Sequence, residues 1–308
     1  MQTDASLLDA PSVESTMRTV NGVDLHVVTA GDPEDPLVVL LHGFPDFWYG
    51  WRDQIEPLVD AGYRVLVPDQ RGYNLSDSPE SIDAYRIEAL TDDIRALIET
   101  EGRDSAHVIG HDWGAIVAWE LAIESEVVDR LGIVNVPHPR AFQEALRSSA
   151  EQLRRSWYVF FFQLPRIPEW VLGHDDYRPL GDALLESGSA AAFSDVDIER
   201  YRASWAATDS LSGLVNWYRA AGLHPTDLLL GDSSERAENT AYTQDEAIDH
   251  PTLIVWGEGD TALIPDLAPM SRQYCPNGRV ERFPDATHWV HQEEAEAVTA
   301  LLLEHLSE

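Results

Sequence analysis

The stretch IGHDWGA, residues 109–115, follows an apolar segment typical of a buried β-strand and leads into a segment typical of a helix. Its frame, Gly110-x-Asp112-x-Gly114, places a small residue on each side of a central side chain, as in the nucleophile elbow at a sharp strand-to-helix turn. At such a turn the backbone N–H of Trp113 lies at the helix N-terminus, where it can stabilise negative charge. The central position commonly holds serine, so the sequence predicts an unusual carboxylate nucleophile, Asp112.

Apolar strands and helices with one apolar face alternate on both sides of this turn. A hairpin over 17–31, with Asn21-Gly22 at its turn, comes first. Strands are then predicted at 36–43, 64–69, 106–112, 131–137, 252–260 and from Arg279 onward. Helices are predicted at 51–62, 86–102, 114–124 and 293–306. Continuous apolar strands joined by helices predict an α/β fold with a mostly parallel sheet covered on both faces.

This alternation stops between His138 and about Ile248, where the chain is rich in aromatic residues and shows only helix-like segments. A helical insertion between two parts of one parallel sheet is expected to lie as a cap over the carboxyl ends of the strands, where open α/β sheets place their sites. We therefore predict a core domain formed by 17–137 and 248–308, a helical cap domain over 138–247, and a flexible segment over 1–16.

The partners of an elbow nucleophile follow it in the order acid, then histidine, each at the end of a later strand. Asp260 follows the strand in VWGEGD, and His288 follows the last strand in FPDATHW. The position after the strand in IVNVP could also carry the acid, but it holds Asn135 and so offers no carboxylate. The competing candidates are Asp266, Asp285 and Glu258 for the acid and His291 for the base. A second backbone donor is expected from the loop HGFPDFWYGWR, at the N–H of Phe44.

The charge of the chain limits its partners. The 54 acidic and 21 basic residues give a formal net charge of −33, which argues against nucleic acid and against an anionic membrane surface. All of the basic residues are arginine and the chain has no lysine. We therefore hypothesise a protein from a high-salt cytoplasm, whose acidic surface repels itself in dilute buffer and is screened in concentrated salt.

The single cysteine, Cys275, allows no intrachain disulfide and indicates a reducing compartment. We interpret it as a small buried apolar residue rather than a nucleophile. The first residues lack the basic and apolar regions of a signal peptide, and no apolar run approaches the ~20 residues of a membrane helix. We therefore expect a soluble, cytoplasmic protein, and the sequence leaves open whether it forms a homo-oligomer.

These motifs resemble those of the α/β-hydrolase family, and specifically its epoxide hydrolases. The resemblance extends from about residue 17 to the end of the chain and rests on HGFPDFWYGWR, DQRGYNLSD, GHDWGA, WGEGD and THW in the family's order. It implies the α/β-hydrolase fold and a cis bond before Pro45. It also implies an oxyanion hole formed by the backbone N–H groups of Phe44 and Trp113, and two substrate-binding cap tyrosines, Tyr158 in SWYVFFFQ and Tyr218 in NWYRA.

An ionised carboxylate can displace an oxygen from a saturated carbon and leave a covalent alkyl ester on the enzyme. Asp112 is expected to attack an epoxide while Tyr158 and Tyr218 assist ring opening. His288, oriented by Asp260, would then activate water against the ester. The expected product is a vicinal diol, formed from a small apolar epoxide and water without cofactor or metal. Apolar cap residues indicate an apolar substituent, namely Phe160, Phe161, Phe162 and Trp170.

Other functions compete with this one. A dehalogenase of the same family would use the same nucleophile, with the Trp113 indole as one halide donor. However, Phe44 stands where haloalkane dehalogenases of the family often carry asparagine, and Trp113 stands where fluoroacetate-type enzymes carry arginine. An acyl hydrolase is disfavoured because an acyl-aspartate would be an anhydride, and a binding module would leave a complete set of catalytic positions unused. We interpret GHDD, residues 173–176, as a polar turn rather than a metal site.

Overall fold

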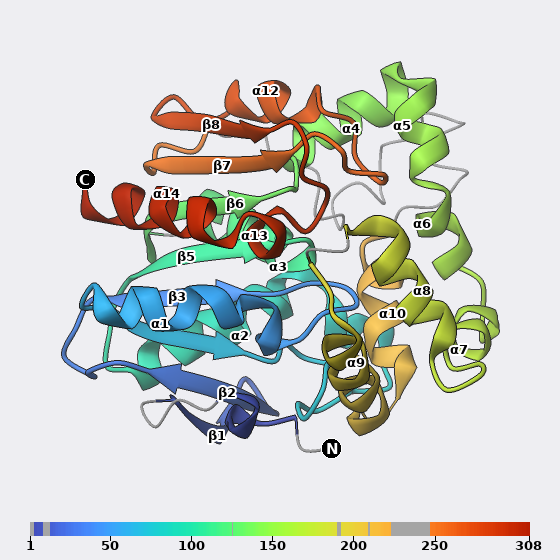
Figure 1. The fold of residues 1–308 in the computed structure, drawn as a ribbon, viewed down its shortest axis with the longest axis horizontal. Coiled ribbons are helices and arrows are strands. Elements are labelled where there is room, and N and C mark those ends of the chain that lie inside the picture. Colours follow the sequence, from blue (N-terminus) through green and yellow to red (C-terminus); the bar gives the residue numbers. More distant parts are fainter. Residues whose placement is uncertain (1–2, 9–12, 125, 190–191, 209, 223–246) are drawn as a thin grey trace.

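The computed structural model describes residues 3–8, 13–124, 126–189, 192–208, 210–222 and 247–308 (Figure 1). Eight strands form one sheet in the order β1-β2-β4-β3-β5-β6-β7-β8. Their bounds are β1 (Val13–Val20), β2 (Val23–Ala30), β3 (Leu37–Leu41), β4 (Arg64–Pro68), β5 (Ala106–His111), β6 (Val128–Val134), β7 (Thr252–Gly257) and β8 (Gly278–Phe283). The strands from β4 to β8 along the sheet pair in parallel, whereas β1 pairs with β2, and β2 with β4, in the antiparallel direction. The predicted α/β fold and hairpin are confirmed.

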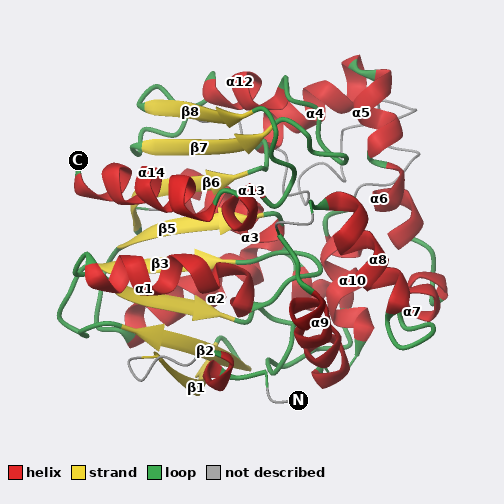
Figure 2. Cartoon of the chain, viewed as in Figure 1, coloured by secondary structure: helices red, strands yellow, loops and turns green. Residues whose placement is uncertain are grey.

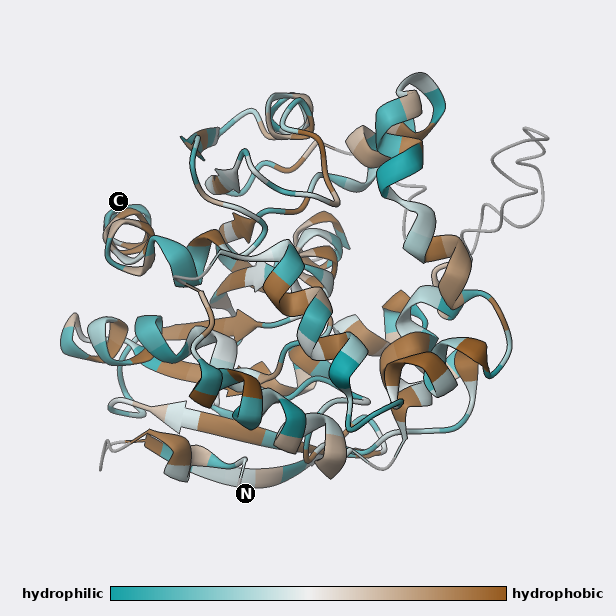
Figure 3. Ribbon diagram, turned by 45° about the vertical axis from the view of Figure 1, so that its right-hand side comes forward, coloured by the Kyte–Doolittle hydropathy of each residue, from teal (hydrophilic) through white to brown (hydrophobic). Residues whose placement is uncertain are grey.

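Helices cover both faces of this sheet (Figure 2). On one face α1 (Arg52–Asp60) lies beside α14 (Ala295–Ser307), and on the other α2 (Ile87–Thr100) lies beside α3 (Trp113–Glu124). The central strands are almost entirely hydrophobic, and the helices around them carry both hydrophobic and hydrophilic residues (Figure 3). The predicted apolar face of α2 is buried, at Leu90, Ile94, Leu97 and Ile98. The layers are stabilised because the hydrophobic strands and the apolar faces of the helices bury each other.

A group of helices separates β6 from β7 and lies at the carboxyl ends of the strands (Figure 1). Its members are α4 (Pro139–Ser148), α5 (Ala150–Arg155), α6 (Trp157–Phe162), α7 (Ile167–Leu172), α8 (Arg178–Ser187), α9 (Asp195–Ala207) and α10 (Leu211–Ala220). We call these helices the cap. Residues 223–246, which the sequence analysis also placed in this region, lie outside the described residues. Residues that follow β3, β5, β7 and β8 line one cavity together with residues of α6, α8 and α10.

Short elements complete the fold. They are the 3-10 helices η1 (Ala5–Leu7), η2 (Trp48–Trp51) and η3 (Ile82–Tyr85), and the helices α12 (Leu267–Arg272) and α13 (Val290–Glu293). Among the described residues, no helix combines the length and the apolar character needed to cross a membrane.

The N-terminal segment differs from the prediction of a flexible stretch over 1–16. The strand β1 begins at Val13, where it already pairs with Ala30 of β2. Thr3 is buried, and its carbonyl accepts hydrogen bonds from the Trp48 indole at 2.8 Å and from the Asn74 amide at 3.1 Å. The polar sequence of β1 is explained by its place at the sheet edge, where only one side of the strand needs a partner.

Candidate active site

The central feature is the turn between β5 and α3, which holds Asp112 in the left-handed region at φ 48°. A Cβ atom on Gly110 would collide with the carbonyl of Gly114, and one on Gly114 would collide with the carbonyl of Leu41. Both flanking positions therefore require glycine, which explains the frame around Asp112 by sterics. The strained turn lifts the carboxylate out of the sheet edge and toward the cap.

The loop after β3 brings backbone donors to this carboxylate. The N–H of Phe44 donates to Asp112 Oδ1 at 2.5 Å. A Cβ atom on Gly43 would meet both that oxygen and the nitrogen of Trp113, so the three groups surround one point. Trp113 is the first residue of α3, and its N–H has no acceptor within the helix. The two predicted oxyanion donors thus lie next to Asp112, and the Phe44–Pro45 bond is cis as the resemblance implied.

A histidine and a second aspartate complete a line of three side chains. His288, in the loop after β8, donates from Nδ1 to Asp260 Oδ2 at 2.7 Å and faces Asp112 Oδ2 with Nε2 at 3.6 Å. The competing residues lie elsewhere: Glu258 pairs with Arg282, Asp266 and Asp285 are exposed, and His291 packs against His111. The structure therefore brings Asp112, His288 and Asp260 together and leaves the alternatives apart.

The sequence did not predict that Asn135 would bind Asp260. Position 135 was considered there only as a possible place for the catalytic acid. Asn135 lies just past β6 at φ 52°, and its amide donates to Asp260 Oδ2 at 2.8 Å. The N–H groups of Ala262 and Leu263 donate to the other carboxylate oxygen at 2.7 and 3.0 Å. These donors hold the Asp260 side chain in place, with one oxygen toward His288. The sequence feature that could have indicated this role is the position of Asn135 directly after a strand, as for Asp260 and His288.

The charges of Asp112, His288 and Asp260 influence one another. Burial by itself lowers the pKa of His288, but the negative charges of Asp260 and Asp112 outweigh burial and raise that pKa to about 10. Burial raises the pKa of Asp112, yet the bond to His288 and its charge outweigh burial and hold that pKa below its usual value. The resting site is therefore an imidazolium between two carboxylates.

Two tyrosines of the cap line the same cavities as Asp112. Tyr158 on α6 and Tyr218 on α10 lie with ring centroids 5.9 Å apart, and Tyr218 is 5.0 Å from the ring of Trp113. Burial, followed by the charge of Asp112, raises the pKa of Tyr218 well above 10, so this phenol keeps its proton. Asp112 and both tyrosines line two cavities, of about 50 Å³ and about 690 Å³.

Only some of the apolar cap residues that were predicted to surround a substrate line a cavity in the structure. Phe161 and Phe162 line the larger cavity. Trp170 is 71% exposed, and neither it nor Phe160 lines the described part of either cavity. The sequence could not separate these residues because a short aromatic run in a helix points in all directions around its axis.

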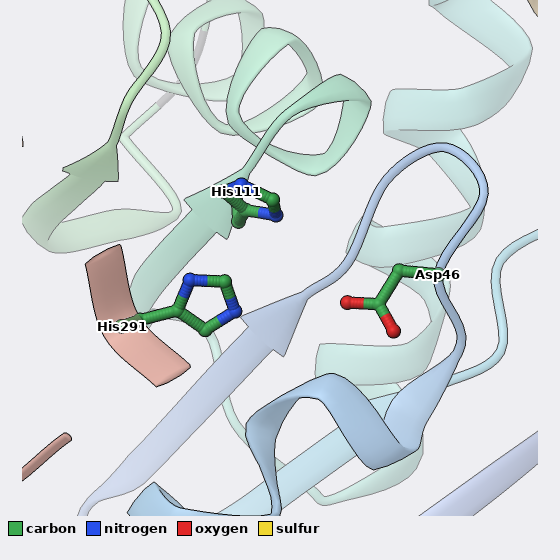
Figure 4. Close-up of side chains that lie close together, drawn as sticks. All are labelled: Asp46, His111 and His291. Atoms are coloured by element: carbon green, nitrogen blue, oxygen red, sulfur yellow. The ribbon is translucent and has the colours of Figure 1, made fainter. Parts of the chain in front are cut away.

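Asp46, His111 and His291 form a buried polar cluster (Figure 4). Asp46 accepts from the Tyr201 hydroxyl at 2.8 Å and from the N–H of Phe47 at 2.7 Å, both at Oδ1. Its Oδ2, Nδ1 of His111 and both ring nitrogens of His291 have no hydrogen-bond partner among the described residues. One atom from each of the three side chains lies within 4.8 Å of the others. His111 Nε2 donates to the carbonyl of His288 at 3.0 Å, which ties the cluster to the site.

The titration of Asp46 predicts a pH-dependent stability. Burial raises the pKa of Asp46 from 3.8 to about 7, against the opposing hydrogen bonds of Phe47 and Tyr201. The folded protein therefore binds a proton that the unfolded chain has released, and this contribution is lost as the pH rises from 3.8 through about 7. We expect wild type, relative to Asp46→Asn, to lose roughly 1.4 kcal/mol of unfolding free energy for each unit of pKa shift over this window. Urea unfolding of both proteins at about pH 5 and about pH 8 measures the loss, and parallel pH profiles would contradict it.

Comparison with known proteins places this arrangement in a family. Residues 36–295 match the alpha/beta hydrolase fold family. The chain is 44% identical to the AB hydrolase superfamily protein YfhM of Bacillus subtilis, over 93% of this chain and 95% of that protein. It is 33% identical to epoxide hydrolase A of Mycobacterium tuberculosis, over 93% and 95%. A solved structure of an epoxide hydrolase variant from Bacillus megaterium superposes with a TM-score of 0.85 at 30% identity, covering 95% of this chain and 100% of that one.

The sheet, the elbow and the line of Asp112, His288 and Asp260 define an α/β hydrolase that carries a carboxylate in the nucleophile position. The chain belongs to the alpha/beta hydrolase fold family and, within it, to the epoxide hydrolases.

Proposed function

We propose that this chain hydrolyses epoxides to vicinal diols through a covalent ester on Asp112, with His288, Asp260, Tyr158 and Tyr218 as the other catalytic side chains. The observation that supports this most strongly is the ionised carboxylate at the elbow, between two backbone donors and an imidazolium. A carboxylate attacks saturated carbon without help from a base, and water can afterwards cleave the resulting ester.

In the first step Asp112 attacks one ring carbon of the epoxide. A bond forms between the carboxylate oxygen and that carbon, and the ring C–O bond breaks with its electron pair on oxygen. The alkoxide that develops is strongly basic, so it needs hydrogen bonds and a proton. Tyr158 and Tyr218 lie on the cap side of Asp112, and Tyr218 keeps its proton throughout the neutral range. We assign the two hydroxyls to this task.

The second step becomes possible because the first step removes the negative charge of Asp112. Once Asp112 is an ester it no longer stabilises the imidazolium, so the pKa of His288 falls and the ring releases the proton that replaces the one given by the tyrosine to the alkoxide. Neutral His288, held by Asp260, then takes a proton from water as the water attacks the carbonyl carbon of the ester. The N–H groups of Phe44 and Trp113 stabilise the oxyanion, each such donor being worth on the order of 10²–10³ in rate. The bond between the ester carbonyl carbon and the substrate oxygen breaks, and that oxygen takes the proton held by His288. The diol leaves, and Asp112 passes its proton to His288, which restores the resting site.

Dehalogenation by the same nucleophile is the less favoured alternative. A halide leaves without a proton and needs N–H donors only, whereas two tyrosines line the cavity beside this nucleophile. The relatives with a named activity among those described above are epoxide hydrolases.

A substrate panel with a tyrosine variant tests the proposal. We expect wild type to convert terminal epoxides to diols and to release little halide from haloalkanes or fluoroacetate. Tyr218→Phe removes one donor to the developing alkoxide, so we expect diol formation to fall by on the order of 10²-fold. Halide release that is indifferent to this substitution would contradict the assignment. Tyr177→Phe, a tyrosine of the cap that lines neither cavity, is the matched control.

We also propose that the protein works in concentrated salt, inside a cytoplasm. The net charge of −33 and the exclusive use of arginine support this. Salt screens repulsion among the carboxylates, since the screening length falls from ~10 Å at about 0.1 M to ~3 Å at about 1 M. We expect the midpoint of thermal unfolding to rise steadily from about 0.1 M to about 2 M KCl. An unchanged midpoint across this range would contradict the hypothesis.

A further inference from the structure

The two cavities beside Asp112 differ in size, and this difference determines where a substrate's substituents can go. The smaller cavity, of about 50 Å³, is lined by apolar side chains that include Ile116, Phe142 and Val159. The larger cavity measures about 690 Å³. The bulky substituent of an epoxide placed at Asp112 must therefore extend into the larger cavity.

Most of the charged side chains that line the larger cavity are negative. Apart from His288, which belongs to the catalytic line, the charged residues among its described lining are carboxylates. Two of them, Asp182 and Glu186, lie away from the catalytic line on α8, four residues apart and so on one face of that helix. Both are exposed, and neither has an ion-pair partner among the described residues. Their charges are therefore available to a substrate.

Aromatic side chains of α6 line the same cavity. Trp157 and Phe161 belong to its lining, with ring centroids 6.1 Å apart. Aromatic faces attract cations and carboxylates attract them further, a combination that suits an ammonium group and opposes an anion. The remaining lining residues are mostly apolar and accept a neutral tail.

We propose, resting on the function proposed above, that this enzyme selects epoxides by the charge of their tail. Asp182 and Glu186 are the residues that determine this specificity. Tails that carry an ammonium group are preferred, uncharged tails are accepted, and tails that carry a carboxylate are rejected.

A neighbouring hollow offers the opposite charge and has to be considered. It measures about 400 Å³, shares Trp157, Asp260 and Thr261 with the larger cavity, and is also lined by Arg154 and Arg155. Arg155 is engaged, since it donates to Glu151 at 2.7 Å and to the carbonyl of Asp260 at 2.6 Å. Arg154 is the one cation there that could attract a carboxylate tail, so it enters the test.

The test uses terminal epoxides of one chain length that end in trimethylammonium, tert-butyl or carboxylate. The first two have the same shape and differ only in charge. We measure kcat/KM for each in wild type, in Asp182→Asn/Glu186→Gln, and in Arg154→Gln. A matched control, Glu88→Gln/Glu99→Gln, removes two exposed carboxylates of α2, outside the cap, so the net charge changes equally without a change in the cavity.

We expect wild type to prefer the ammonium over the carboxylate substrate by on the order of tenfold at about 0.1 M salt, and less at about 1 M. The preference should collapse in Asp182→Asn/Glu186→Gln and persist in the Glu88→Gln/Glu99→Gln control. A preference that survives in the α8 variant, or a wild-type preference for the carboxylate that Arg154→Gln abolishes, would overturn the proposal. Absence of diol from the tert-butyl substrate in folded wild type would instead overturn the proposed function itself, and the charge selection with it.

Discussion

Replacing Asp112 with alanine is expected to lower diol formation by on the order of 10⁴-fold or more, because no other side chain can form the ester. The oxyanion donors and the cavity remain, but they have no attached substrate to act on. Initial rates with a terminal epoxide measure the effect. Circular dichroism establishes that the variant is folded.

The control for this prediction is Asp285→Ala, which removes an exposed carboxylate at the same edge of the sheet. We expect it to keep wild-type rates within about twofold, as surface substitutions away from a site usually do. A loss of activity in the Asp112 variant no larger than in this control would contradict the assignment of the nucleophile.

The second large effect is expected from His288→Gln, which stops the reaction half way. Asp112 still attacks the epoxide, because attack by a carboxylate needs no base. Hydrolysis of the ester then lacks its base, so we expect steady-state turnover to fall by on the order of 10³-fold or more while the alkyl-enzyme accumulates. Intact mass measurement after mixing with substrate should show the protein heavier by one substrate molecule.

His291→Gln is the matched variant, since His291 was the competing base in the sequence and lies in the buried cluster instead. It should hydrolyse the ester and show no added mass. Accumulation of the ester in the His291 variant and not in the His288 variant would reverse the assignment of the base.

The elbow and its partners could be predicted from sequence because their constraints are local. Gly110 and Gly114 are required by close backbone contacts within one turn, so the chain records them as a short frame. Asp260 and His288 follow strand ends, and strand ends can be located from apolar runs.

Residues that depend on the register between strands could not be predicted in the same way. Asn135 reaches Asp260 because β6 and β7 are neighbours in the sheet, a fact that no local pattern carries. Asp46, His111 and His291 meet from three separate segments for the same reason. The sequence did not predict that the strand would begin at Val13. An edge strand buries few side chains, so β1 is mostly polar and lacks the apolar run that marks the other strands.

The central claim, that Asp112 forms a covalent ester, is tested most directly by one turnover of excess wild-type enzyme in water enriched in oxygen-18. If the ester forms, the diol takes its new oxygen from the Asp112 carboxylate and leaves unlabelled, while the heavy oxygen from water is found in the peptide that contains Asp112. If water attacks the epoxide directly, the diol carries the label after a single turnover and Asp112 does not. The account predicts the first result, and the second would contradict it.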